Sequence, residues 1–440
     1  MSQVEAPRRP GLMSLEDALA RLLGAAAVLP GELELPTLEA DGRVLAQDIR
    51  SALDVPGFDN SSMDGYAVNS SEVAAAIAAG QVLPVSQRIP AGHFGPELQP
   101  GSVARIFTGA PVPEGADAVQ MQEEAEVQPD GSVRFQQAPA AGQFIRRRGE
   151  DIRQGEVVLA AGTRLGPAEL GLAASLGLAS LPVRVRPRVA LFSTGDELVM
   201  PGQVAPEAMA PGAIYNSNRY FLAVLLRRLG CEVSDLGIVP DRRDATIQAL
   251  QQAAESHDLI VTSGGVSVGE EDHVKPAVQQ LGGLDLWQIA IKPGKPFAHG
   301  WIGRSVQAGE QGDAAGRCHF VGLPGNPVSS FVTSLLLVRP FLRRLQGVTV
   351  GLGVPAQPGA DGLPPALALP AHFDWPRADR RREFLRVRRN ATGGLDLFPN
   401  QSSGVLTSVA WCDGLVDLPA GQTVARGDSV NFIPLAALLG

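Results

Sequence analysis

Apolar residues near the start of the chain recur at the spacing of an α-helix, which repeats every 3.6 residues. The recurring positions are Leu15, Ala18, Leu19, Leu22 and Leu23. Ser14 and Asp17 resemble a capping box at the front of this run, with Asp in place of the usual Glu. The pattern predicts that the first element is an amphipathic helix.

Between about residues 36 and 148 the apolar runs are short, and Pro-Gly, Asp-Gly and Pro-Glu-Gly turns break them. Val103–Phe107 and Ala118–Gln122 are the clearest runs, and their length is typical of β-strands. The stretch therefore predicts a small β-rich domain.

Strands and helices alternate from about residue 184 onward. The predicted strands are Arg188–Phe192, Glu232–Ile238, Leu259–Thr262, Leu286–Ile291 and His319–Gly322. The predicted helices are Pro167–Ala174, which Gly177 can end, then Asn218–Leu229, Ala245–Ser256 with Asp244 as its cap, and Val328–Leu345. Such alternation favours a parallel sheet covered on both faces, so we assign residues 184–346 to a doubly wound α/β domain.

The segment Gly347–Pro370 is rich in Gly, Pro and Ala and is typical of a linker. Beyond it, short strands alternate with turns, most clearly at Leu385–Arg389, Leu395–Phe398 and Gly414–Leu418. Strands of this length favour a small β-barrel at the C-terminal end.

Composition narrows the class of protein. The 440 residues carry a net charge of −9 and no long basic run, which argues against a general nucleic-acid binder. The three cysteines form no CxxC pair, so a disulfide framework or zinc site is not expected and a reducing compartment fits. The first residues do not resemble a signal peptide, and the longest apolar stretch, around Phe331–Val338, is too short to span a bilayer. We therefore expect a cytoplasmic protein that binds neither nucleic acid nor membrane.

Polar residues and glycines follow every predicted strand of the α/β block. They are Ser193, Thr194, Gly195, Asp196 and Glu197 after the first strand, Asp241 after the second, Ser263, Gly264, Gly265, Ser267 and Asp272 after the third, Lys292, Lys295 and Pro296 after the fourth, and Pro324, Gly325, Asn326, Pro327 and Ser329 after the fifth. Because parallel sheets bind ligands at the carboxyl ends of their strands, we expect these residues to share one crevice.

The residue types in this crevice indicate a phosphate-containing ligand and a metal. Glycines let backbone N–H groups approach oxygen atoms, the helix after Asn326 adds partial positive charge, and lysines add full charges. Glu197, Asp241 and Asp272 are hard oxygen donors suited to Mg²⁺. Each piece alone has a simpler explanation, since a Gly-Gly-Val-Ser run is usually a turn, Asp196 can cap a helix and lone lysines are usually solvated. Neither a Walker loop nor a Gly-x-Gly-x-x-Gly fingerprint is present.

Seven strings along the chain resemble those of the MoeA-type molybdopterin molybdenumtransferases, the family that includes the C-terminal region of gephyrin. They are DVPGFDNSSMDGYAV at 54–68, TGAPVPEGADAV at 108–119, RRRGED at 146–151, STGDEL at 193–198, SGGVSVG at 263–269, KPGKP at 292–296 and LPGNP at 323–327. Their order fits too, and the resemblance covers the chain from Gly11 to about Ile433.

The resemblance implies an α/β multidomain fold, in which a doubly wound, adenylyltransferase-like parallel-sheet domain is joined by two small β-rich domains and a split linker domain. The implied division is 11–53 with 149–183 for the split domain, 54–148 for the small β-rich domain, 184–346 for the α/β domain and 347–440 for the barrel. It also implies a homodimer, with each site lying between the sheet of one subunit and the small β-domain of the other.

The implied reaction joins molybdate to adenylylated molybdopterin, with Mg²⁺ or another divalent cation, and releases AMP. A molybdopterin adenylyltransferase would be the donor of the substrate. The resemblance implies that Asp64, Thr108 and Asp151 reach the site from the partner subunit. Glu197, Asp241 and Asp272 would handle metal, phosphate or water. The molybdate-facing pocket would comprise Ser267, Lys292, Lys295, Pro296 and Ser329, with Pro324 and Pro327 shaping the loop beside it.

Several alternatives stay open at the level of sequence. Without the resemblance, Asp64 in Met-Asp-Gly is better explained as a turn cap, and Arg146–Arg148 as salt bridges at a subunit contact. Gln288 stands where many family members carry a basic residue, which would weaken attraction for an anion. The rival functions are a molybdopterin adenylyltransferase and a scaffold without catalysis. The Asp64 and Arg146 strings argue against the first, and the intact acidic and lysine strings argue against the second.

Overall fold

The computed structural model describes residues 12–265, 273–304, 316–349 and 363–439. The chain divides into two compact units. The larger unit consists of Met1–Ala46, Ala161–Pro167 and Ser180–Gly440, and the smaller unit of Gln47–Ala160 and Ala168–Ala179. We describe each unit by itself. The finer division into four domains stays a prediction.

A six-stranded sheet forms the centre of the larger unit. Its order is β16 (Glu232–Val239), β13 (Arg188–Thr194), β17 (Leu259–Ser263), β21 (Arg317–Leu323), β20 (Pro296–Gly303) and β18 (Gly282–Gln288). The first four strands are parallel, and β20 is antiparallel to both of its neighbours. Since β18 is antiparallel to β20, it runs in the same direction as the four parallel strands.

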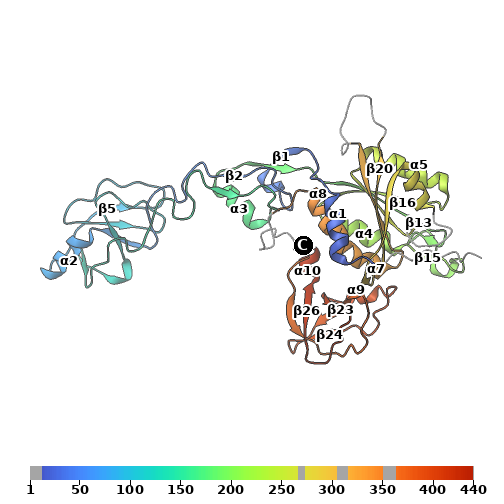
Figure 1. The fold of residues 1–440 in the computed structure, drawn as a ribbon. Helices are drawn as coiled ribbons and strands as arrows, with labels where there is room; N and C mark the ends of the chain where they lie inside the picture. Colours follow the sequence, from blue (N-terminus) through green and yellow to red (C-terminus); the bar gives the residue numbers. More distant parts are fainter. Residues whose placement is uncertain (1–11, 266–272, 305–315, 350–362, 440) are drawn as a thin grey trace, which may run out of the picture. The chain divides into compact units, whose positions relative to one another are not determined.

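Helices cover both faces of this sheet (Figure 1). They are α1 (Leu15–Gly24), α4 (Ser217–Arg228), α5 (Arg243–Ser256), α6 (Val274–Leu281), α7 (Pro327–Thr333) and α8 (Arg339–Leu345), with a π-helical turn at Ser334–Val338 between the last two. Side chains alternate between the faces of a strand. On β13, Val189 and Leu191 pack with α1, α4 and α8, whereas Ala190 and Phe192 pack with α5 and α6. The doubly wound prediction is therefore confirmed.

Two details of the predicted sheet and one predicted helix cap are wrong. Strand β20 was not predicted, so the sheet is mixed and not wholly parallel. The predicted strand Leu286–Ile291 is divided, because β18 ends at Gln288 and a separate short strand β19 occupies Ile291–Lys292. Helix α5 begins at Arg243, so Asp244 lies inside its first turn and does not cap it. Near a helix N-terminus the carboxylate of Asp244 is still favourable.

The first helix begins as predicted. The backbone N–H of Asp17 donates to Ser14 Oγ at 3.0 Å, and the apolar face of α1 is buried in the core that also contains Leu226 and Phe341. Two strand pairs complete this part of the larger unit. They are β1 (Glu32–Pro36) with β12 (Ser180–Arg184), and β14 (Leu198–Val199) with β15 (Ile214–Tyr215).

The C-terminal part of the larger unit is built on a six-stranded sheet, which β19 (Ile291–Lys292) joins beside β23. Its other strands are β22 (Leu367–Pro370), β23 (Arg382–Arg389), β24 (Leu395–Leu397), β25 (Gly414–Leu418) and β26 (Ser429–Pro434). Helix α9 (Thr407–Trp411) lies between β24 and β25, and α10 (Leu435–Leu439) follows β26. A single bridge connects Ala371, the residue after β22, to Leu395 of β24, and the predicted barrel domain stays a prediction. The predicted linker is wrong at its end, since β22 pairs with β26.

The smaller unit is built on a four-stranded sheet of order β5 (Val85–Ile89), β6 (Val103–Ile106), β4 (Gly65–Val68) and β7 (Ala118–Met121). Short pairs surround it, namely β2 (Ile49–Arg50) with β11 (Val157–Leu159), β3 (Asn60–Ser61) with β10 (Ile145–Arg146) and β8 (Ala125–Val127) with β9 (Val133–Phe135). Its helices are α2 (Ser70–Ala78) and most of α3 (Pro167–Ser175). Both strands predicted in this region are confirmed.

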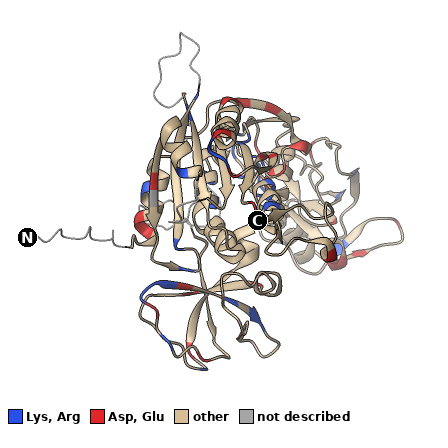
Figure 2. Ribbon diagram, turned by 90° about the vertical axis from the view of Figure 1, so that its right-hand side faces the viewer, with Lys and Arg blue, Asp and Glu red and all other residues tan. Residues whose placement is uncertain are grey.

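Basic and acidic residues are interspersed along the ribbon in Figure 2, as a net charge of −9 without a basic run leads one to expect. Cys231, Cys318 and Cys412 are buried, and none of these three forms a disulfide bond. Within the described ranges, none of the helices has both the length and the apolar character needed to cross a membrane.

Candidate active site

The carboxyl ends of β13, β17 and β21 meet at a cavity of about 630 Å³, a size typical of small-ligand sites. The strand register places Ser193 opposite Ser263, and Ser263 opposite Leu323. The lining residues are Thr194, Glu197, Leu198, Ile214, Tyr215, Asn216, Ser217, Asn218, Ser263, Gly264, Gly265, Pro296, Pro324, Gly325, Asn326, Pro327 and Gly404. Ten of these were predicted: Thr194, Glu197, Ser263, Gly264, Gly265, Pro296, Pro324, Gly325, Asn326 and Pro327.

Glycine is required where the chain turns after β17. Gly264 and Gly265 have φ angles of +94° and +67°, which L side chains rarely adopt. A Cβ atom on Gly265 would lie 2.5 Å from Val274 Cγ2, and the N–H of Gly264 donates to the carbonyl of Leu323 at 3.1 Å. The pair therefore brings bare backbone to the wall of the cavity.

Glu197 is the one residue with a full charge among the described residues that line the cavity. Its carboxylate lies against Gly195, since a Cβ atom there would be 2.5 Å from Glu197 Oε2. Mg²⁺ is commonly held by one or two carboxylates together with substrate phosphate oxygens, and Glu197 fits that mode. The described part of the chain contains no group of three or more His, Cys, Asp or Glu side chains that could hold a metal by itself.

The other two predicted acidic residues do not add to the cavity wall. Asp241 follows β16, is half-buried and does not line the cavity. Asp272 and Ser267 lie outside the described residues.

The start of α4 forms a wall that sequence reasoning missed. Asn216 caps the helix, because its side-chain oxygen accepts the N–H of Arg219 at 3.2 Å, and it is only 2% exposed. Asn218 Nδ2 donates to Ser263 Oγ and to the carbonyl of Gly325, both at 2.7 Å. Asn218 thus ties α4 to the segments after β17 and β21. The polar run at 216–218, just before an apolar-periodic helix, was the available signal.

The start of α7 at Pro327 agrees with the prediction, but its N–H groups are partly used. The N–H of Val328 donates to the carbonyl of Ser403 at 2.9 Å, whereas the N–H of Ser330 makes the first bond of the helix itself, to the carbonyl of Asn326 at 2.9 Å. Proline has no N–H to offer. The helix end therefore has fewer donors for an anion than the sequence suggests. Gly404, next to Ser403, brings the barrel to the cavity, which no sequence signal indicated.

The predicted lysines Lys292 and Lys295 do not line the cavity. Lys292 Nζ forms ion pairs with Glu383 Oε1 at 2.8 Å and with Asp379 Oδ2 at 3.3 Å. Burial by itself lowers the pKa of Lys292. The hydrogen bond and charge of Glu383, and then those of Asp379, raise it by more than burial lowers it. The pKa of Lys292 therefore lies above its ordinary value, and the ammonium stays charged. Lys295 is exposed, and Gln288 ends β18 opposite Pro296.

Two predicted serines and one predicted glycine lie outside the cavity lining. Ser193 on β13 and Ser329 on α7 are buried and do not line the cavity. Gly195 has a φ angle of +145° and leaves room for the Glu197 carboxylate.

Three predicted residues belong to the smaller unit. Asp64 Oδ1 accepts the backbone N–H of Thr108 at 2.8 Å and its hydroxyl at 2.9 Å. These hydrogen bonds lower the pKa of Asp64, so its carboxylate is ionised, and they connect it to Thr108 and not to the Met-Asp-Gly turn that the simpler alternative names. Asp151 is exposed, and its backbone N–H donates to the carbonyl of Val55 at 3.1 Å.

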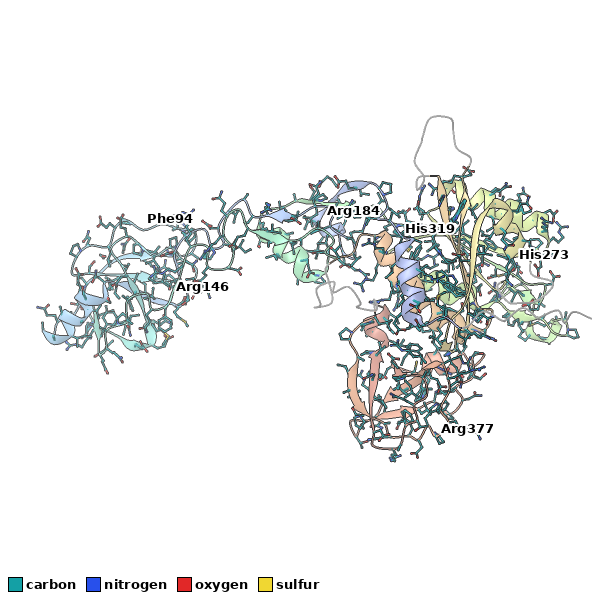
Figure 3. All side chains as sticks on the ribbon, in the orientation of Figure 1. Phe94, Arg146, Arg184, His273, His319 and Arg377 are labelled. Carbon is teal, nitrogen blue, oxygen red and sulfur yellow. The ribbon has the colours of Figure 1, made fainter. Side chains whose placement is uncertain are left out.

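The arginine string also forms ion pairs inside the smaller unit. Arg147 pairs with Asp59 and Arg148 with Asp54, each at 2.7 Å, while Arg146 lies on β10 (Figure 3). Arg147 and Arg148 therefore already have acidic partners within their own chain.

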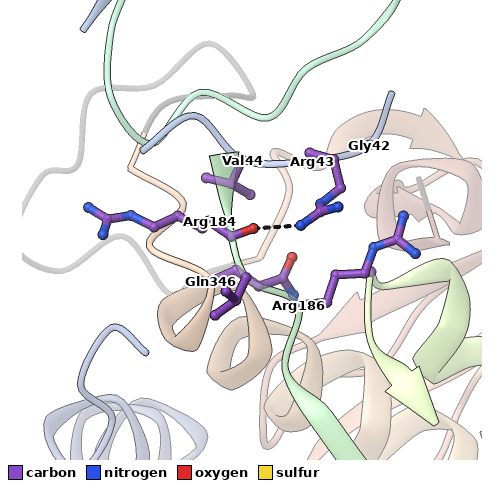
Figure 4. A pocket seen from close by; sticks show the side chains of 8 residues that line it. Gly42, Arg43, Val44, Arg184, Arg186 and Gln346 are labelled. Atoms are coloured by element: carbon purple, nitrogen blue, oxygen red, sulfur yellow. Dashed lines mark hydrogen bonds between the residues drawn. The ribbon is translucent and has the colours of Figure 1, made fainter. Parts of the chain in front are cut away.

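A second cavity lies against Arg43, Arg184 and Arg186 (Figure 4). Its volume of about 10 Å³ is that of a single water. Arg43 Nη2 donates to the carbonyl of Arg184 at 2.8 Å, so this guanidinium already has a backbone partner. The larger cavity at the strand ends is the candidate site.

Three family models match the chain in sequence. They are the MoeA N-terminal region (domain I and II) at residues 13–177, the "Probable molybdopterin binding domain" at 190–344 and the MoeA C-terminal region (domain IV) at 368–435. A molybdopterin molybdenumtransferase of Haemophilus influenzae is 42% identical over 76% of this chain and 78% of its own length. The chain belongs to the MoeA family.

Other MoeA relatives agree. A molybdopterin molybdenumtransferase of Synechococcus elongatus is 36% identical and is matched over 96% of this chain and 99% of its own length. The crystal structure of a molybdopterin biosynthesis MoeA protein from Pyrococcus horikoshii superimposes with a TM-score of 0.77 at 27% identity, covering 96% of this chain and all of that one. Except for Gly404, every residue lining the cavity of this MoeA protein lies inside the matched molybdopterin-binding region.

Proposed function

We propose that this MoeA chain is a molybdopterin molybdenumtransferase, which inserts molybdate into adenylylated molybdopterin and releases AMP. The observation that carries the proposal is the cavity at the ends of β13, β17 and β21, within the region matched to molybdopterin-binding domains. Relatives matched over most of the chain carry the name of this activity.

The residues of the cavity suit a large ligand with phosphate groups. The backbone at Gly264, Gly265 and Gly325 offers close approach to phosphate oxygens. Asn216 and Asn218 present polar atoms at the opposite wall. Glu197 would hold Mg²⁺, which when bound stabilises negative charge on the phosphoanhydride that is cleaved. Asp241, and Asp272 and Ser267 beyond the described residues, would complete the acidic and hydroxyl groups of the site.

The remaining parts of the proposal are supported by the resemblance of sequence strings. The enzyme acts as a homodimer, and Asp64, Thr108 and Asp151 of the smaller unit serve the site of the partner subunit. The substrate is unstable and carries an activated phosphoanhydride, so a molybdopterin adenylyltransferase supplies it directly. The reaction takes place in the cytoplasm, where free cysteines such as Cys231 stay reduced.

Complementation tests the proposed function. A bacterial strain without its own molybdenumtransferase has inactive molybdenum enzymes. Expression of this chain should restore their activity at low external molybdate, whereas Glu197→Ala should not, although both proteins accumulate to equal levels. Failure of the folded wild-type chain to restore activity would contradict the proposal.

A further inference from the structure

The ammonium of Lys292 contacts carboxylates of the C-terminal β-rich segment. The short strand β19 pairs in parallel with β23 of the barrel, and its register places Lys292 opposite Glu383. The ammonium lies 2.8 Å from Glu383 Oε1 and 3.3 Å from Asp379 Oδ2. A residue that the sequence assigns to an anionic substrate is therefore bound to two carboxylates of another domain.

Both carboxylates are fixed by further donors. Glu383 is only 2% exposed, and Trp375 Nε1 donates to its second oxygen at 2.8 Å. Arg381 grips Asp379 with two parallel bonds of 3.0 and 2.9 Å. Burying a carboxylate costs free energy unless the carboxylate is paired and hydrogen-bonded. The contacts of Lys292 with Glu383 and Asp379 therefore differ from an ordinary surface ion pair, which contributes little to stability.

The ammonium keeps one donor for a ligand. A lysine has three N–H groups, and ion pairs with two carboxylates engage at most two of them. The Lys292 side chain is 38% exposed, so the third can be reached from outside. The chain continues from Lys292 to Pro296, which lines the cavity, so only three residues separate the lysine from a lining residue.

We propose that Glu383 and Asp379 are positioning residues, which hold Lys292 so that its remaining N–H meets the oxyanion substrate. The inference rests on the proposed function, in which that oxyanion is molybdate. The barrel thereby takes part in substrate binding without touching the substrate through these two carboxylates.

Two other roles for the carboxylates predict different results. If Glu383 only neutralises Lys292, its removal frees positive charge and strengthens molybdate binding. If it only braces the barrel, its removal lowers the melting temperature and leaves the KM for molybdate unchanged. Positioning predicts weaker molybdate binding, although the local charge becomes more positive.

The variant Glu383→Gln separates these roles. Trp375 and Lys292 contact different oxygens of Glu383, and glutamine replaces one of these oxygens by an NH₂ group that cannot accept, so the side chain keeps its shape but can no longer hold both donors. We expect the KM for molybdate to rise about tenfold, as for the loss of one charge-assisted hydrogen bond, with a much smaller change in kcat. Asp379→Asn should change the KM in the same direction.

Matched variants show whether the effect passes through Lys292. Asp413→Asn removes a barrel carboxylate that pairs with Arg389 and not with Lys292, and it should leave the KM unchanged. In a Lys292→Met background, Glu383→Gln should have no further effect on the KM. A KM for molybdate that falls or stays the same in Glu383→Gln overturns the proposal, as does an undiminished effect in the Lys292→Met background.

Calorimetric titration with molybdate alone distinguishes this inference from the proposed function. Wild-type protein that binds molybdate but releases no AMP contradicts the function only. The inference then requires that Glu383→Gln weakens molybdate binding by the same factor. Wild-type protein that binds no molybdate overturns the inference as well.

Discussion

His299 and His319 stack on the neighbouring strands β20 and β21, with ring centroids 6.0 Å apart. His299 is 7% exposed, and its Nε2 has no partner within the described residues. Burial, and secondly the neighbouring His319, lowers the pKa of His299 to about 4. The imidazole is therefore neutral in the folded protein at physiological pH, and it packs as an apolar ring between Trp287 and Phe341.

This histidine predicts a loss of stability in mild acid. The unfolded chain binds a proton near pH 6.5, whereas folded His299 binds one only near pH 4. Between these values the unfolded state holds more protons, so the free energy of unfolding falls as the pH falls, by on the order of 3 kcal/mol in total. Urea unfolding at several pH values from 7 to 4 measures this loss. The slope should be clearly smaller in His299→Leu, and equal slopes in both proteins would refute the assignment.

At the scale of elements, local signals predicted the helices and strands better than their pairing. The Ser14 cap, the start of α7 at Pro327 and the strands β6 and β7 follow from residues within a few positions of each other. Asp244 misled because Asp is favourable both at a cap and in the first turn. Strand β20 was missed because its sequence, PFAHGWIG, contains a proline and two glycines, and its pairing with β18 and β21 supplies what local propensity lacks.

The side chain of Asn218 connects α4 to the segments after β17 and β21, so its removal should lower the stability of the folded protein. In Asn218→Ala the hydroxyl of Ser263 and the carbonyl of Gly325 lose a shared donor, and the free energy of unfolding should fall by about 1–3 kcal/mol. Asn326→Ala is the matched control, because Asn326 lines the same cavity, is exposed and makes no side-chain cap bond. Chemical denaturation of both variants checks this. Equal costs would show that the two bonds of Asn218 contribute little.

At the scale of the whole molecule, the rule that ligands bind at strand ends accounts for the predictable part of the site. It placed Thr194, Glu197, Gly264, Gly265 and the loop at 324–327 around one cavity, because the parallel strands β13, β17 and β21 share one edge. The rule could not show that Lys292 forms an ion pair with Glu383, nor that Gly404 lines the cavity. These contacts join segments that are far apart in the sequence, as with Lys292 and Glu383 or Val328 and Ser403, and only the folded chain brings them together.

The central claim is that this cavity catalyses molybdate-dependent cleavage of adenylylated molybdopterin. The most direct test is AMP release by the purified protein with Mg²⁺, measured with and without molybdate. We predict release that depends on molybdate, and a fall of roughly 100-fold in Glu197→Ala with substrate still bound, since Glu197 is the charged group of the cavity wall. Release that ignores molybdate, release unchanged in Glu197→Ala, or no release from folded protein that binds the substrate would contradict the account.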